Sequence, residues 1–274
     1  MQLASTLLGP DSASRCVVLL HGILGSGGNL RGLGRRLAEQ LPGTRIALFD
    51  LRGHGDSADY ARSVGAPHTV RACVEDVERA LRELRLQADF VIGHSFGGKV
   101  ALMFAQIFPH GVRQAWALDS TPGVKRDRDG GEVGHVYRVL REVPTPFASR
   151  DAMLQALESR GIASGIARWM TTNLRRDGDV YEWAFDLDVV SDLLDDYFRQ
   201  DLWPWLEERR GAPDIHLLRA LDSDRFSQDD AQRARALPPQ ARVTLHELPD
   251  SGHWVHADNP EGLLEILRSE LSHG

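Results

Sequence analysis

The sequence is poor in cysteine and lacks long apolar runs. It contains two cysteines, Cys16 and Cys73, in 274 residues. Both fall in apolar segments where small buried side chains are expected, and a disulfide framework would need more of them, so a reducing compartment is favoured. The first residues do not join a basic segment to a long apolar stretch, which argues against a signal peptide. No segment approaches the ~18 apolar residues of a transmembrane helix. We therefore expect a cytoplasmic protein with no membrane partner.

Long basic runs and metal-ligand spacings are also missing. The net charge is −7, so the electrostatic footprint of a nucleic-acid-binding protein is absent and no nucleic-acid partner is expected. Lys99 and Lys125 are the only lysines among 32 basic residues, a bias that we interpret as compositional. Several histidines lack partners at metal-ligand spacing, and we predict neither a metal site nor a cofactor. These isolated histidines are His68, His110, His135, His216 and His246.

Apolar segments alternate with helical patterns along most of the chain. Because these segments are apolar throughout, they suit strands buried on both faces of a parallel sheet. They are residues 16–20, 46–49, 90–92, 115–118, 215–218 and 243–246. Apolar side chains at spacings of three and four predict helices, which cover 30–41, 70–84, 98–108 and a last segment from about Pro260. The alternation predicts an α/β fold with a doubly wound, mostly parallel sheet.

The pattern changes after Thr121-Pro122-Gly123. No strand is predicted from there to about Ala212, where charged helical stretches are broken by Gly and Pro. We therefore predict a core formed by residues 1–123 and 213–274, with a helical cap, 124–212, inserted between late strands. Ligands bind at the carboxyl edge of such sheets, so the cap is expected to cover that edge.

A Gly-x-Ser-x-Gly pentapeptide, Gly93 to Gly97, stands between a predicted strand and a predicted helix. This context is typical of a nucleophile elbow, in which a turn too sharp for flanking side chains leaves the serine hydroxyl exposed. Free N–H groups at the start of the helix would stabilise an oxyanion at Ser95. We predict Ser95 as a nucleophile.

A serine hydroxyl needs an adjacent base to act near neutral pH. His253 follows the last predicted strand and precedes the final helix, so a loop there can bring its imidazole to the elbow. We predict His253 as the base, and His256 is the fallback.

Three aspartates are candidates for the acid that orients the base. Asp119 ends the strand that follows the elbow helix, whereas Asp222 and Asp224 follow the later strand 215–218. Each can accept the Nδ1–H of His253 and fix its tautomer. Asp119 is preferred, and Asp224 and Asp222 remain open in that order.

Two backbone N–H groups are needed to hold the oxyanion. One is expected at Phe96, directly after the nucleophile, and the other in the loop His21 to Gly25 after the first predicted strand. Within that loop Ile23 is our choice, with Leu24 behind it.

The segment 50–57 and the tryptophans of the insertion each suggest a functional role that has a structural alternative. Asp50 to Ser57 offers His, Asp and Ser together, but neighbours in sequence cannot fold onto one another as a triad requires, so we interpret it as a hydrogen-bonded turn. Four tryptophans of the insertion could line an acyl pocket, although a core within the insertion itself is the stronger expectation. They are Trp169, Trp183, Trp203 and Trp205.

Together these segments resemble the α/β-hydrolase superfamily, and most closely small esterases with Gly-His-Ser-[Met/Phe]-Gly-Gly-Lys at the elbow. The resemblance implies Ser95 as nucleophile, His253 as base, Ile23 and Phe96 as the oxyanion hole, and Asp119 as the acid. Where many relatives have Gly-x-x-Asp or Gly-Gly-Asn-Ser, this chain has Ala220-Leu221-Asp222-Ser223-Asp224, which keeps Asp224 open as the acid.

The expected activity is that of a serine hydrolase cleaving carboxylic esters of small to medium acyl chains through an acyl-enzyme on Ser95. A thioesterase, lactonase, carbon–carbon bond hydrolase or perhydrolase is the alternative, because the same triad serves all of them. A non-catalytic binding protein on this scaffold is a second alternative. The expected partner is a small-molecule ester or thioester, and the sequence indicates no oligomeric state.

Overall fold

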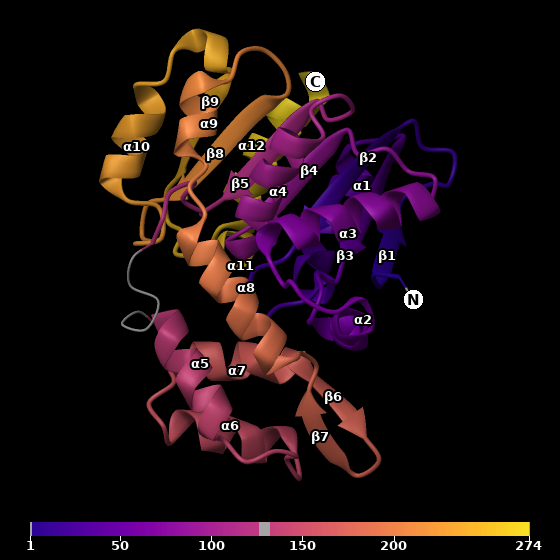
Figure 1. Cartoon of the computed structure of the whole chain (residues 1–274), viewed down its shortest axis with the longest axis vertical. Helices are drawn as coiled ribbons and strands as arrows, with labels where there is room; N and C mark the ends of the chain where they lie inside the picture. Colours follow the sequence, from indigo (N-terminus) through magenta and orange to yellow (C-terminus); the bar gives the residue numbers. More distant parts are fainter. Residues whose placement is uncertain (1, 126–131, 274) are drawn as a thin grey trace.

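The computed structural model describes residues 2–125 and 132–273. Its centre is a seven-stranded sheet in the order β1-β3-β2-β4-β5-β8-β9, in which every neighbouring pair is parallel except β1 with β3 (Figure 1). The strands of this sheet are β1 Ser5–Leu8, β2 Arg15–Leu20, β3 Thr44–Phe49, β4 Phe90–His94, β5 Gln114–Leu118, β8 Asp214–Ala220 and β9 Val243–Leu248. The predicted doubly wound, mostly parallel α/β fold is confirmed.

Helices cover both faces of the sheet and also form most of the insertion between β5 and β8. They are α1 Arg31–Gln40, α2 Ala58–Val64, α3 Val70–Glu83, α4 Phe96–Ile107, α5 Glu132–Glu142, α6 Arg150–Glu158, α7 Ser164–Met170, α8 Leu187–Arg199, α9 Trp203–Glu208, α10 Gln228–Arg235, α11 Val255–Asp258 and α12 Pro260–His273. Apolar residues of α1 and α12 pack on one face, and those of α3, α4 and α10 pack on the other. Successive side chains of the strands alternate between these two clusters, as the pleat requires.

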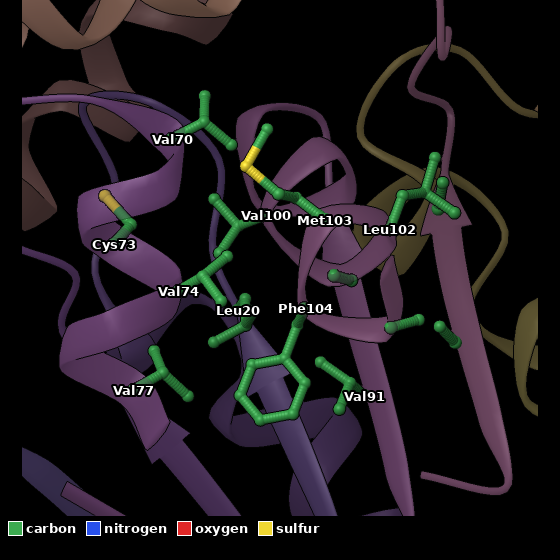
Figure 2. Close-up of a cluster of buried hydrophobic side chains, with 14 of the residues drawn as sticks. Leu20, Val70, Cys73, Val74, Val77, Val91, Val100, Leu102, Met103 and Phe104 are labelled. Atoms are coloured by element: carbon green, nitrogen blue, oxygen red, sulfur yellow. The ribbon is translucent and has the colours of Figure 1, made fainter. Parts of the chain in front are cut away.

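The layer between the sheet and the helices α3 and α4 is a continuous apolar core. Leu20 and Val91 of the strands meet Val74 of α3 and Val100 and Phe104 of α4 there (Figure 2). Cys73 is also buried in this layer, and both cysteines are free. Since α4 begins directly after the elbow serine, this packing fixes where the serine lies.

Two strand regions were missed by the sequence analysis. β1 is a short, partly buried edge strand, and its four residues give no clear apolar run. The prediction that residues 124–212 contain no strand is wrong, because β6 Leu174–Asp177 and β7 Val180–Trp183 form an antiparallel hairpin. Three of the four residues of β6 are exposed and three are charged, so apolar patterning cannot reveal the strand. Gly178 supplies the positive φ of the turn, +56°.

The insertion between β5 and β8 has a separate apolar cluster. Figure 1 shows α5, α6, α7 and the β6–β7 hairpin together at one end of the sheet, with α8 running from them to the core. Val190 and Leu194 on one side of α8 join the insertion's cluster, whereas Val189 and Leu193 join the core cluster. Helix α8 therefore packs in both clusters and links the insertion to the core.

Candidate active site

Ser95 lies in the sharp turn between β4 and α4, with φ +53° and ψ −116°. The turn requires glycine at its flanks. A Cβ on Gly93 would lie 1.8 Å from the carbonyl oxygen of Gly97, and a Cβ on Gly97 would lie 2.4 Å from that of Leu20. Since both obstacles are backbone atoms, no side-chain movement relieves them. The strained backbone at Ser95 is held by the packing of β4 and α4 on either side.

The structure brings Ser95, His253 and Asp119 together from three strand ends. His253 Nε2 lies 3.1 Å from Ser95 Oγ, and His253 Nδ1 lies 2.7 Å from Asp119 Oδ2. Asp119 is fully buried, and the His253 side chain is 18% exposed, so the imidazole borders the accessible side of the site. The other candidate acids, Asp222 and Asp224, are exposed and lie outside this chain of contacts; Asp224 pairs with Arg225.

The carboxylate of Asp119 has two further donors. The Ser223 hydroxyl donates to Oδ2 at 2.6 Å, and the backbone N–H of Ala220 donates to Oδ1 at 3.2 Å. These bonds satisfy a buried charge that would otherwise be costly, and they fix its orientation toward His253. The sequence analysis missed Ser223, since a serine in a loop after a strand carries no distinguishing pattern.

His94, the residue before the nucleophile, supports the loop that carries His253. Its Nε2–H donates to the backbone carbonyl oxygen of His253 at 2.7 Å, which fixes the Nε2–H tautomer. Burial, followed by the positive field of His253, holds the pKa of His94 well below its usual range. The neutral ring thus acts as a fixed donor. The fallback base, His256, packs edge-on against His94 at 5.1 Å between ring centroids and makes no hydrogen bond to Ser95 or Asp119.

The two predicted N–H donors occupy suitable backbone positions. Phe96 is the first residue of α4, so its N–H has no acceptor within the helix. Ile23 borders the same cavity as Ser95. Leu24 is excluded as a free donor because its N–H is directed to His54 Nε2 at 3.1 Å.

The segment 50–57 is a hydrogen-bonded turn, as predicted. Asp50 accepts the N–H groups of Gly27 at 2.7 Å and Asp56 at 2.8 Å, which joins this turn to the loop after β2. His54 donates from Nδ1 to the carbonyl oxygen of Arg52 at 2.9 Å, so its Nε2 is the acceptor for Leu24. Burial lowers the pKa of His54 to about 3 and keeps the ring neutral.

His21 holds the same loop from the other side. Its Nδ1–H donates to the Gly22 carbonyl oxygen at 2.7 Å, and its Nε2 accepts the N–H of Leu51 at 2.9 Å. Burial lowers the pKa of His21 to about 4. Two neutral, oriented imidazoles therefore fix the backbone on which Ile23 lies, a role that the sequence analysis did not assign to them.

Two cavities meet at Ser95 and His253. The first, which we call the Trp169 lobe, has a volume of about 50 Å³ and a mostly apolar wall, formed by Gly22, Ile23, Leu24, His94, Glu132, Val133, Val136, Ile166, Trp169, Arg225 and Trp254. The second, the Lys125 lobe, measures about 30 Å³ and is lined by Ile23, Phe96, Lys125, Val133, Leu194, Tyr197, Phe198 and Arg225. Of the four tryptophans of the insertion, Trp169 alone is among these wall residues, and Trp203 is buried in the main core.

Lys99, in the Gly-Gly-Lys end of the elbow motif, is fully buried. Its ammonium donates to the carbonyl oxygens of Gly123 at 2.7 Å, Tyr197 at 2.8 Å and Gln200 at 2.9 Å. Burial, followed by repulsion from Lys125, lowers the pKa of Lys99 to about 7. The side chain thereby joins α4 to the loop after β5 and to the end of α8, next to the Lys125 lobe.

Within residues 2–125 and 132–273, no group of three or more His, Cys, Asp or Glu side chains could hold a metal ion. Among the helices of the same residues, none is both long and apolar enough to cross a membrane.

Comparison with known proteins places this architecture in a family. The model of the alpha/beta hydrolase family matches residues 17–266. The chain belongs to the alpha/beta hydrolase family. The resemblance to this family that the sequence indicated is thus confirmed.

Two relatives and one solved structure illustrate the similarity. The chain is 28% identical over 281 residues to the sn-1-specific diacylglycerol lipase ABHD11 of Mus musculus, covering 99% of this chain and 86% of the relative. It is 26% identical over 259 residues to esterase YbfF of Escherichia coli, covering 93% of this chain and 92% of the relative. The structure of a marine microorganism esterase superposes with a TM-score of 0.79 at 21% identity, covering 99% and 98% of the two chains, and supports the fold.

Proposed function

We propose that the protein hydrolyses carboxylic esters of small to medium acyl chains through an acyl-enzyme on Ser95. The observation that carries the proposal is the unbroken series of contacts from Asp119 through His253 to Ser95 at the junction of two cavities. The lipase and esterase named among the relatives support the same reaction class. Residues 1–123 and 213–274 form the proposed core, and 124–212 the proposed cap.

In the first half-reaction His253 Nε2 takes the proton of Ser95 Oγ as the oxygen attacks the ester carbonyl carbon. Asp119 orients the ring and stabilises the imidazolium. The N–H groups of Ile23 and Phe96 donate to the oxyanion of the tetrahedral intermediate, an interaction for which each donor is worth about 10²–10³ in rate. The imidazolium then protonates the departing alcohol, and the acyl group stays on Ser95.

In the second half-reaction water replaces the alcohol. His253 takes a proton from the water as it attacks the acyl carbon, and the collapse of the second tetrahedral intermediate returns the proton to Ser95 and releases the acid.

The cavities favour the short end of the acyl range. About 50 Å³ and 30 Å³ correspond to a few water-sized groups each.

A fluorophosphonate probe and para-nitrophenyl esters of graded acyl length test this function. The wild-type protein should be labelled at Ser95 and should hydrolyse short esters fastest. Ser95→Ala should abolish labelling and lower kcat by about 10³-fold or more while the fold is retained. Ser159→Ala, at an exposed serine of the insertion, is the matched control and should behave as wild type. If Ser95→Ala keeps most of the esterase activity, the mechanism is wrong.

A further inference from the structure

The Lys125 lobe differs from the Trp169 lobe in charge. Lys125 and Arg225 both line it, whereas none of its described wall residues is an aspartate or glutamate. Glu132 lines only the Trp169 lobe. Two cations therefore border a small, partly enclosed space that touches Ser95 and His253. Like charges in such a space are unfavourable unless an anion lies between or beside them.

Lys125 is poorly compensated for a half-buried cation. Its backbone N–H donates to the carbonyl oxygen of Phe198 at 3.0 Å, which fixes the residue against the end of α8. Among the described residues, no carboxylate makes an ion pair with its ammonium group. Burial, followed by repulsion from Arg225, lowers the pKa of Lys125 below its usual range.

Arg225 is only partly satisfied. Its Nη2 pairs with Glu132 at 2.9 Å, and Asp224 Oδ1 lies 3.4 Å from Nε. The Nε is nevertheless buried without a hydrogen bond among the residues described. The Arg225 side chain is 19% exposed and borders both lobes, so an incoming anion can reach it. Its partner Glu132 is half exposed, and a stronger acceptor in the lobe could compete with it.

Asp224, Asp119 and Asp230 favour the charged form of Lys125 without forming an ion pair with it, but burial and Arg225 outweigh them, since the pKa of Lys125 is lowered overall. Asp119 is fully buried and faces His253, Ser223 and the N–H of Ala220. Lys99 donates to three carbonyl oxygens, and its pKa of about 7 leaves it only partly charged near neutral pH.

We propose that the Lys125 lobe binds an anionic group, a carboxylate carried by the ester a few bonds from its scissile carbonyl. The volume of about 30 Å³ fits a group of the size of a carboxylate. Lys125 and Arg225 supply charge-assisted hydrogen bonds, which are stronger than neutral ones. The inference rests on the proposed function, because the carboxylate is placed relative to an ester carbonyl at Ser95. Hydrolysis consumes one water and yields the acid and the alcohol, and the bound carboxylate takes no part in the bond changes.

Matched substrates test the preference and distinguish the acyl side from the alcohol side. The para-nitrophenyl monoester of glutaric acid is compared with para-nitrophenyl pentanoate, and meta-acetoxybenzoate with phenyl acetate. For one pair the wild-type protein should favour the anionic ester in kcat/KM by about ten- to a hundredfold, mainly through KM. A ratio of one or less for both pairs overturns the proposal.

Variants then assign the preference to the lobe. Lys125→Gln should lower the anionic-to-neutral ratio by about tenfold or more, and Lys125→Arg should retain it. Glu132→Gln should raise the ratio because Arg225 loses its competing partner. Arg175→Gln removes the same charge from an exposed position of β6 and should leave the ratio unchanged. An unchanged ratio in Lys125→Gln overturns the role of the lobe.

Binding to an inactive protein separates this inference from the proposed function. Monomethyl glutarate and meta-acetoxybenzoate are titrated calorimetrically into Ser95→Ala and into Ser95→Ala/Lys125→Gln. Ser95→Ala should bind at least one of the two ligands, and Ser95→Ala/Lys125→Gln should bind that ligand about tenfold more weakly or not at all. If no ester is turned over, the proposed function fails, while this titration still decides the anion site. Absence of binding to Ser95→Ala overturns the site even where esterase activity is present.

Discussion

The two sides of the cavity are built in different ways. The core side consists of loops at strand ends, and their backbone is fixed by hydrogen bonds that His21 and His94 donate and that His54 accepts from Leu24. The side formed by the insertion presents mainly apolar side chains of α5, α7 and α8, such as Val136, Ile166 and Leu194. We propose on this ground that the core side supplies the chemistry, while the insertion determines which group fits beside it. The predictions compare matched residues that differ in their distance from the reacting groups.

The largest difference is expected between two glycines. Gly97→Ala places a Cβ 2.4 Å from the carbonyl oxygen of Leu20, whereas a Cβ on Gly165 in α7 meets nothing within 4 Å. Gly97→Ala should lower the free energy of unfolding by several kcal/mol or prevent folding, as overpacking against backbone cannot relax. Gly165→Ala should raise it by about 0.5–1 kcal/mol, because alanine is the better helix former. Urea titrations of both variants measure the contrast, and similar stabilities would show that the elbow tolerates a side chain.

The next effect separates the candidate acids. Asp119→Asn removes the acceptor of the His253 Nδ1–H at 2.7 Å, so the ring no longer has a fixed tautomer. We expect kcat for a short ester to fall by about 10³–10⁴-fold. Asp224→Asn alters an exposed carboxylate that pairs with Arg225 and should leave kcat for a neutral ester within about twofold. A larger loss in Asp224→Asn than in Asp119→Asn would exchange the roles of the two residues.

The acid pair also shows what the sequence could and could not predict. Asp119 and Asp224 both follow neighbouring parallel strands, β5 and β8, so strand ends alone place both near His253. The side-chain directions decide between them. The backbone of Asp119 takes φ +46°, and its side chain meets His253, whereas the turn after β8 carries Asp224 to the surface. Such a turn is not readable from apolar patterning.

The limits of apolar patterning also explain which other features the sequence did not predict. The strands β2, β4 and β5 and the elbow were predictable because long buried runs and obligatory glycines leave a strong pattern. The hairpin β6–β7 was not, since β6 is mainly exposed and charged and all four residues of β7 are only partly buried. His94 occupies the variable position of Gly-x-Ser-x-Gly, where no rule of spacing reveals its bond to the His253 carbonyl oxygen.

An intermediate effect concerns the stability of the core loops in acid. Burial lowers the pKa of His54 to about 3 and that of His21 to about 4 from 6.5. These rings bind protons at a higher pH in the unfolded chain than in the folded protein. The stability they contribute is therefore fully present above about pH 6.5 and is lost as the pH falls toward the pKa values of the folded state. Each ring should cost about 2 kcal/mol between pH 7.5 and 5. Urea titrations at the two pH values should show a smaller loss in His54→Gln than in wild type.

The matched control for that measurement lies in the cap. His135→Gln alters a half-exposed histidine of α5 and should leave the pH-dependent loss as in wild type. If both variants show the wild-type loss, the buried ring of His54 does not carry the acid sensitivity.

The smallest effect is expected at two aromatic residues of the insertion. Trp169 borders the Trp169 lobe and packs on Trp254 at 4.4 Å between ring centroids, whereas Trp183 packs on Phe147 and Phe185 away from the cavity. Trp169→Phe should raise KM about threefold, equivalent to the ~0.5–1.5 kcal/mol of one aromatic contact. Trp183→Phe should change KM less than twofold.

If the Trp169 lobe holds the acyl chain, the increase in KM for Trp169→Phe grows with acyl length in para-nitrophenyl esters. An increase that is the same at every length would instead assign that lobe to the alcohol, and equal effects in the two variants would remove the distinction between wall and interior.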